Sequence, residues 1–160
     1  MDARQFVIGL GSSIGDRERW LRLGTRILDA QPGVEIEASS RIYESLPVGG
    51  VAQGRFMNAA LRLHFTGSPL DLLQICQHVE GRCGRQRRLR YGDRTLDLDM
   101  LWWSGGAQDS PYLKLPHPEL WRRPFAWRPL LEVALSDWEL KCPDIERVRE
   151  AGIDRGPLAI

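Results

Sequence analysis

The predicted fold rests first on the stretch Thr95-Leu96-Asp97-Leu98-Asp99-Met100-Leu101-Trp102. Polar and apolar side chains alternate in it as far as Met100. Because successive side chains of a β-strand point to opposite faces of a sheet, a strand here places Asp97 and Asp99 on one face and Leu98 on the other. The stretch therefore predicts a strand with two carboxylates on one side and a core on the other.

Similar patterns elsewhere predict the remaining elements. Apolar or alternating runs predict further strands at 6–10, 34–43, 56–65 and 112–115. Apolar residues at helical spacing predict helices at 16–30, 69–83 and 125–133. The order begins strand, helix, strand, strand, helix, strand. It is typical of an α+β, ferredoxin-like sandwich, with a mainly antiparallel sheet and helices packed on one face.

Length and composition suit a single globular domain. The chain has 160 residues, 42% of them hydrophobic, so we expect one domain over 1–160 with an irregular tail at 136–160. A net charge of +1 argues against a protein that wraps nucleic acid. Met1 to Gln5 do not resemble a signal peptide, and no stretch has about 18 uncharged apolar residues. We therefore expect a cytoplasmic protein with no membrane partner.

The strand with the two carboxylates directly follows a segment rich in arginine. Between Arg82 and Arg94 the chain has six arginines and one acid, Asp93. Paired carboxylates suit Mg²⁺, and arginines suit phosphate oxygens, so together they are typical of phosphoryl transfer. Two other interpretations stay open, because Asp97 and Asp99 could lie on a solvated strand face and the arginines could form a charged, soluble loop.

Other residues gain meaning only in combination. No Gly-x-x-x-x-Gly-Lys-Ser/Thr loop is present, so a Walker-type phosphate cradle is not expected. The amide of Asn58 could hydrogen-bond the edge of a heterocycle, and Phe56 and Phe125 could stack on its ring. His117 could contact a phosphate or be satisfied by the backbone. Each of these residues, taken alone, has a purely structural explanation.

The chain resembles the 6-hydroxymethyl-7,8-dihydropterin pyrophosphokinases of folate biosynthesis. The clearest match is the block Gly92-Asp93-Arg94-Thr95-Leu96-Asp97-Leu98-Asp99, which differs at one position from the family signature Gly-Pro-Arg-Thr-Leu-Asp-Leu-Asp. Supporting matches are Gly11-Ser12, Pro47-Val48-Gly49, Phe56-Met57-Asn58-Ala59-Ala60, Glu80, Gly84-Arg85, Pro116-His117-Pro118, Arg123 and Phe125. The resemblance covers about residues 6 to 135.

This resemblance implies transfer of the β,γ-pyrophosphoryl group of ATP to the pterin hydroxymethyl group, leaving AMP. Two Mg²⁺ ions would be held by Asp97 and Asp99, and catalysis would also involve Arg85 and Arg94. ATP would be bound by Gln77, Glu80, Arg87, Arg90, Arg94, Leu98, His117 and Arg123. The pterin would be bound by Ser45, Leu46, Val48, Phe56, Asn58, Tyr91, Asp97 and Phe125.

Two departures from the family pattern keep alternatives open. Ser13 replaces an asparagine that usually follows Gly-Ser, and Asp93 replaces the proline of the signature. With these two departures, the chain could also be a diverged paralogue of the family. A noncatalytic ferredoxin-like module that binds nucleotide or RNA is a further alternative, although no RNA-binding signature is present. We expect the small molecules ATP and hydroxymethyl-dihydropterin as partners, no nucleic acid, and a monomer.

Overall fold

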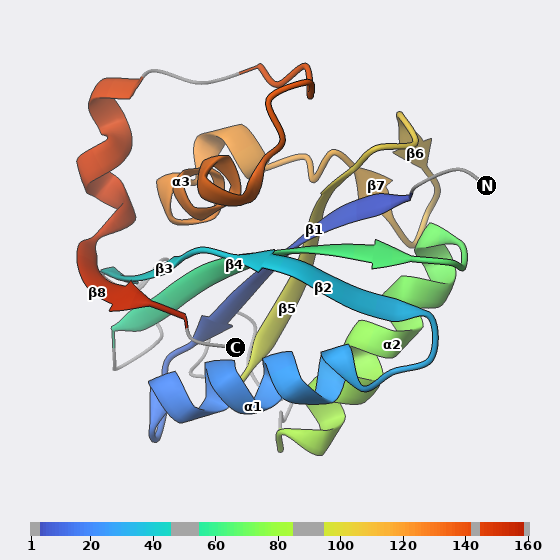
Figure 1. The fold of residues 1–160 in the computed structure, drawn as a ribbon. Coiled ribbons are helices and arrows are strands. Elements are labelled where there is room, and N and C mark those ends of the chain that lie inside the picture. Colours follow the sequence, from blue (N-terminus) through green and yellow to red (C-terminus); the bar gives the residue numbers. More distant parts are fainter. Residues whose placement is uncertain (1–3, 46–54, 85–94, 142–144, 159–160) are drawn as a thin grey trace.

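The computed structural model describes residues 4–45, 55–84, 95–141 and 145–158. Its main feature is a six-stranded sheet in which five strands follow the order β5-β1-β4-β3-β8 and β2 pairs with β4 (Figure 1). All of the pairings are antiparallel. The strands are β1 (Gln5–Ser12), β2 (Val34–Ser39), β3 (Arg41–Ser45), β4 (Phe56–Phe65), β5 (Asp97–Trp103) and β8 (Ile153–Pro157).

The helices cover both faces of the sheet. Helices α1 (Arg17–Asp29) and α2 (Pro69–Arg82) lie on one face, and α3 (Pro124–Val133) lies on the other (Figure 1). Ser68 and Asp71 form a capping box at the start of α2, and the Asp16 side chain caps α1, as the sequence indicated. The prediction of an α+β fold with a mainly antiparallel sheet and helices packed on it is confirmed, and the later helix α3 covers the face opposite to α1 and α2.

Two hydrophobic cores explain this three-layer arrangement. Phe6, Ile8 and Leu10 point from β1 into the core beneath α1 and α2. Val7 points the other way, into a smaller core with Leu101 of β5 and side chains of α3. The sequence did not indicate this second core, because a continuous apolar run such as that of β1 does not tell whether one face or both faces of the strand are buried.

A bulge in β5 changes the direction of its side chains. Ile8 pairs with Met100 and Val7 with Trp102, so Leu101 is the extra residue between them. Beyond the bulge Trp103 pairs with Phe6 and stacks on its ring, with centroids 5.4 Å apart. The alternation that begins at Thr95 therefore ends where the bulge starts.

The remaining elements differ in detail from the sequence prediction. The strand expected at 34–43 is two strands, β2 and β3, which pair with different halves of β4. The expected strand near 112–115 is the short β7 (Lys114–Leu115), which pairs with β6 (Gln108–Asp109). Short helices η1 (Leu120–Arg122) and η2 (Ile145–Ala151) complete the structure, and the tail adds β8 to the main sheet. Over the described ranges, no helix has the length and apolar character needed to cross a membrane.

Candidate active site

The candidate site lies on the α3 face of the sheet, where three strands present polar side chains side by side. In the register Gly11 of β1 pairs with Asp97 of β5 on one side and with Asn58 of β4 on the other. A Cβ at Gly11 would lie 3.1 Å from Asn58 Oδ1 and 3.9 Å from Asp97 Cβ. The absence of a side chain at Gly11 therefore leaves space between Asp97 and Asn58.

The two aspartates share this face as the alternation predicted. Asp97 and Asp99 are half-buried, whereas Leu98 between them is buried on the opposite face. No group of three or more His, Cys, Asp and Glu residues gathers at one point in the part of the chain that the structure describes. A cation held by Asp97 and Asp99 would therefore take its other ligands from water or a substrate. This donor set fits Mg²⁺, which keeps waters and substrate phosphates around one or two carboxylates.

A buried acid supports this strand from behind. Glu80 of α2 is 3% exposed, and its Oε2 accepts a hydrogen bond of 2.9 Å from the backbone N–H of Leu98. Strand β5 lies at the edge of the sheet, so this N–H has no neighbouring strand on that side. Glu80 thus satisfies a buried donor between the two aspartates. This contact assigns Glu80 a supporting place behind Asp97 and Asp99.

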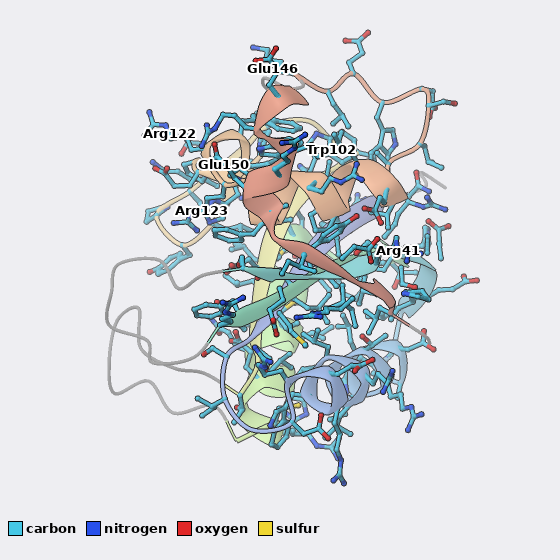
Figure 2. All side chains as sticks on the ribbon, turned by 90° about the vertical axis from the view of Figure 1, so that its left-hand side faces the viewer. Arg41, Trp102, Arg122, Arg123, Glu146 and Glu150 are labelled. Carbon is cyan, nitrogen blue, oxygen red and sulfur yellow. The ribbon has the colours of Figure 1, made fainter. Side chains whose placement is uncertain are left out.

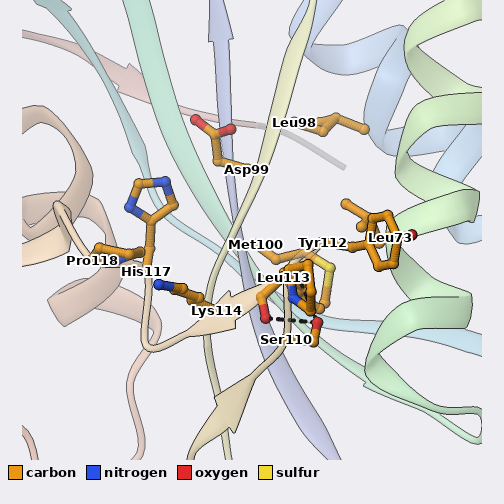
Figure 3. Close-up of a pocket in the computed structure, with 11 residues that line it drawn as sticks. Leu73, Leu98, Asp99, Met100, Ser110, Tyr112, Leu113, Lys114, His117 and Pro118 are labelled. Atoms are coloured by element: carbon orange, nitrogen blue, oxygen red, sulfur yellow. Dashed lines mark hydrogen bonds between the residues drawn. The ribbon is translucent and has the colours of Figure 1, made fainter.

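His117 is fixed on the same side of β5 as Asp99 (Figure 3). Its backbone N–H donates to the carbonyl of Leu101 at 2.8 Å, and its Nδ1 accepts the N–H of Glu119 at 3.0 Å. Because Nδ1 accepts, the neutral ring carries its proton on Nε2. Burial and the neighbouring Arg123 cation lower the pKa of His117. The ring is therefore held as a neutral donor near the aspartates.

A cavity of about 320 Å³ opens beside the edge strand β5, between α2 and the β6–β7 pair (Figure 3). One side carries Asp99, Lys114 and His117, and the other is mainly apolar. The lining residues are Leu73, Leu98, Asp99, Met100, Ser110, Pro111, Tyr112, Leu113, Lys114, His117 and Pro118. An apolar recess that ends in charged groups suits a ligand with a flat apolar part and an anionic part.

On the other side of Asp97 lies a second group of site residues. Asn58 is 7% exposed, and its Nδ2 donates to Ser45 Oγ at 3.2 Å. Ser45 pairs with Phe56 across β3 and β4, which places these three residues together. Asn58 keeps a buried amide next to the space left by Gly11. The group can therefore present amide donors and an acceptor beside an aromatic ring.

The comparison with protein families decides between the interpretations. The model of the family described as "7,8-dihydro-6-hydroxymethylpterin-pyrophosphokinase (HPPK)" matches residues 7–135. The chain belongs to the HPPK family. That match covers β1 to α3 and therefore the whole face described above.

Individual relatives agree with this assignment. A 2-amino-4-hydroxy-6-hydroxymethyldihydropteridine pyrophosphokinase of Methylorubrum extorquens is 36% identical, over 96% of this chain and 94% of that one. One of the same name from Pseudomonas aeruginosa is 35% identical, over 95% and 96%. The bifunctional protein FolKE of Lactococcus lactis subsp. cremoris is 36% identical over 90% of this chain, which spans only 40% of that protein.

A solved structure supports the fold separately. The likeness is to a crystal structure of an HPPK-DHPS in complex with substrates, with a TM-score of 0.52 and 12% identity. It covers 96% of this chain and 36% of that one. At this identity the likeness shows that the HPPK fold is shared, and no more.

The structure locates only part of the expected HPPK site. It brings together Asp97, Asp99, Leu98 and His117 around β5, with Asn58, Phe56 and Ser45 on the neighbouring strands. Gln77 lies on the exposed side of α2, Arg123 directly precedes α3, and Phe125 is in its first turn. The expected site residues outside the described ranges are Leu46, Val48, Arg85, Arg87, Arg90, Tyr91 and Arg94.

The sequence prediction missed several residues that the structure places at the site. Gly11 is one, although its Gly-Ser motif was noted, because only the strand register shows it between Asn58 and Asp97. Lys114 and Tyr112 are others, because they line the cavity from the short hairpin. Lys114 is one of only two lysines in the chain, and this rarity is the sequence signal that could have pointed to it.

Proposed function

We propose that this HPPK-family chain transfers the pyrophosphoryl group of ATP to the hydroxymethyl group of 6-hydroxymethyl-7,8-dihydropterin. The products are AMP and the pterin diphosphate, a step of folate biosynthesis. One observation carries the proposal: Asp97 and Asp99 stand on a single sheet face between the cavity beside β5 and the buried amide of Asn58. A transfer between two substrates requires both to be held with their reacting groups at one centre.

The cavity beside β5 is the proposed nucleotide site. Leu98 and Met100 supply an apolar surface for the base, while Lys114 and His117 supply donors for the anionic part. His117 is held so that Nε2–H can donate, and its neutral form avoids the cost of a buried cation. Gln77, Glu80, Arg87, Arg90 and Arg123 are the other ATP residues that the family resemblance suggests, and Arg85 and Arg94 are proposed to stabilise the transferred group.

The group around Asn58 is the proposed pterin site. A reduced pterin carries donors and acceptors along one edge, and the Asn58 amide can pair with both kinds. Phe56 and Phe125 are proposed to stack on the two faces of the ring. Ser45 already accepts one N–H of Asn58 at 3.2 Å, which fixes the orientation of the amide. Leu46, Val48 and Tyr91 are further pterin residues suggested by the resemblance.

Asp97 and Asp99 are proposed to hold two Mg²⁺ ions. When bound, these cations would neutralise the phosphate oxygens and polarise the reacting groups. The two carboxylates would orient the metals, because β5 fixes both side chains on one face and Glu80 holds the backbone between them. We also propose that residues 1–160 form one domain that works as a cytoplasmic monomer.

The test is release of AMP. The purified chain is incubated with ATP, Mg²⁺ and 6-hydroxymethyl-7,8-dihydropterin, and AMP and the pterin diphosphate are measured by chromatography. We expect AMP to form only when the pterin is present, and to disappear with EDTA. AMP at background level in the complete mixture would overturn the proposal and favour a binding module.

A further inference from the structure

A buried carboxylate behind the proposed pterin site joins three separated parts of the chain. Glu44 of β3 is 7% exposed. Its Oε2 lies 2.7 Å from Arg17 Nη2, at the start of α1, and its Oε1 accepts a 2.9 Å hydrogen bond from Arg155 Nη2 in β8. The pKa of Glu44 is lowered, first by the hydrogen bond from Arg155 and also by Arg17. We call Arg17, Glu44 and Arg155 the Glu44 clamp.

The clamp lies on the face of the sheet opposite the site. Tyr43 donates its hydroxyl to Glu132 of α3, which places Tyr43 on the α3 face. Glu44, one residue further along β3, points to the other face, toward α1. Ser45 then returns to the side on which it contacts Asn58. The clamp can therefore act on the pterin only through the backbone of β3.

Arg17 also reaches the neighbouring strand. Its Nη1 donates to the carbonyl of Arg55 at 2.6 Å, while Nη2 contacts Glu44. Arg55 directly precedes Phe56, and Glu44 directly precedes Ser45. Phe56 and Ser45 are partners in the register. One guanidinium thus bridges the two chain segments that carry the proposed pterin residues.

The C-terminal tail packs closely against the backbone of Glu44. Glu44 pairs with Ile153 of β8, and the neighbouring Gly152 has a φ of +112°. A Cβ at Gly152 would lie 2.0 Å from the carbonyl oxygen of Glu44, so only glycine allows this approach. Residues 152–155 lie beyond the part of the chain that the HPPK model matches, 7–135. The tail therefore adds a contact that this family match does not include.

We infer that the Glu44 clamp is a positioning device that sets Ser45, Phe56 and Asn58 for the pterin, with the C-terminal strand β8 as one of its parts. The inference rests on the proposed function. Glu44 points away from the site face, so the clamp is not placed to contact the substrates. Loss of a clamp residue should therefore weaken pterin binding selectively and leave the nucleotide site intact.

The chain supplies a matched control on the same two strands. Arg41 of β3 and Asp154 of β8 form an ion pair of 2.6 Å, with side chains 50% and 43% exposed. Arg41 begins β3, whereas Glu44 and Ser45 end it, and Figure 2 shows Arg41 on the opposite side of the view from Arg123. Arg41→Gln removes another, more exposed β3–β8 ion pair without touching the segment next to Ser45. It therefore separates loss of general strand stability from loss of the clamp.

The experiment measures binding of each substrate separately by calorimetry, on variants shown by circular dichroism to be folded. The pterin is titrated in the presence of Mg²⁺ and a non-hydrolysable ATP analogue. We expect Arg155→Gln and Arg17→Gln to raise the pterin Kd about 5- to 20-fold, the range of coupling through positioning residues. The Kd of the ATP analogue should stay within about twofold. Arg41→Gln should change neither the pterin Kd nor the Kd of the ATP analogue.

Conservative variants complete the test. Arg155→Lys should restore pterin affinity, because Arg155 contacts Glu44 through one nitrogen. Arg17→Lys should restore it only in part, because Arg17 uses two nitrogens on two acceptors. A pterin Kd of Arg155→Gln equal to that of Arg41→Gln, or an equal loss of the ATP analogue, would overturn the inference. A wild-type chain that forms no pterin-dependent AMP would overturn the proposed function as well.

Discussion

The two faces of strands β1, β4 and β5 differ in how far their apolar cover extends. Toward α1 and α2 the apolar surface is continuous, as at Ile8, Leu61 and Leu98. Toward α3 the apolar side chains Val7 and Leu101 are followed along the strands by polar groups. The same strands therefore provide a complete core on one face and a core that ends at a site on the other.

This difference implies that activity depends on the α3 face, whereas the face toward α1 and α2 contributes to stability alone. Burial of apolar side chains under α1 and α2 stabilises the sheet, so the polar residues of the other face need not contribute. Substitutions on the two faces should then have separable effects. Single substitutions on either face, assayed for both turnover and stability, test that separation.

Asp97→Asn should have the largest effect, and on activity alone. The substitution removes one of the two proposed metal carboxylates, so we expect turnover to fall by about 10³-fold or more. Asp97 is half-buried on the site face, so the melting temperature should change little. Steady-state AMP formation and a thermal melt measure the two quantities. Near-normal turnover would show that the metal assignment is wrong.

Ile8→Ala should have the opposite pattern. Ile8 is fully buried beneath α1 and α2, and its truncation should lower the free energy of unfolding by about 2–5 kcal/mol. Below the melting temperature the folded fraction should keep the wild-type KM for both substrates. Urea unfolding and steady-state kinetics provide the measurements. A raised pterin KM at full folding would contradict the separation of the two faces.

Glu80 contacts the strand that carries the two aspartates from the opposite face, so its substitution should affect both stability and turnover. Glu80→Ala leaves the Leu98 N–H buried without its acceptor, which costs about 1–3 kcal/mol of stability. Because this N–H lies between the two aspartates, we also expect a loss of turnover that extra Mg²⁺ partly restores. Glu80→Gln keeps an acceptor oxygen and should recover most of the lost stability. Equal losses for both variants would mean that the charge of Glu80 matters more than its hydrogen bond.

Gly11→Ala should have a smaller and local effect. The new Cβ would stand 3.1 Å from Asn58 Oδ1, so the amide must move by a few tenths of an ångström. We expect the pterin KM to rise by about 3- to 10-fold, equivalent to roughly 1 kcal/mol, with the ATP KM unchanged. Kinetics at saturating levels of the other substrate measure this. A rise in the ATP KM alone would place the pterin elsewhere.

The smallest expected effect concerns His117 and pH. Its pKa in the folded chain is lowered from 6.5 by burial and Arg123, so the unfolded chain takes up a proton first as pH falls. Stability contributed by neutral His117 is therefore present above pH 6.5 and is lost as pH drops below that value. His117→Asn should make the melting temperature fall less between pH 7 and 5. An equal slope in both proteins would contradict this prediction.

The sequence predicted most of the fold, because its signals are local. The alternation around Asp97 and the capping box at Ser68 each depend on a few neighbouring residues. The face that α3 covers was not predicted, since an apolar run does not tell which face of a sheet a later helix will cover. Strand β8 was missed because its residues, such as Asp154 and Arg155, are polar and exposed, and its pairing with β3 is a long-range contact.

The candidate site could be predicted only in part for a related reason. The paired aspartates follow from strand alternation, and the family resemblance suggested Asn58 and His117. The space at Gly11 and the backing by Glu80 depend on register and on contact between separate elements. Such contacts are set by packing of the whole domain, which a single sequence does not specify.

Because of the bulge at Leu101, the number of residues in β5 decides the face to which each of its side chains points. The extra residue lets Asp97 and Asp99 face the site while Trp103 turns into the opposite core against Phe6. Its carbonyl also anchors the backbone of His117 at 2.8 Å. Removing one residue here would exchange inward and outward positions on one side of the deletion. Substitutions of side chains in 97–103 therefore keep this spacing, whereas the insertion or deletion of one residue does not.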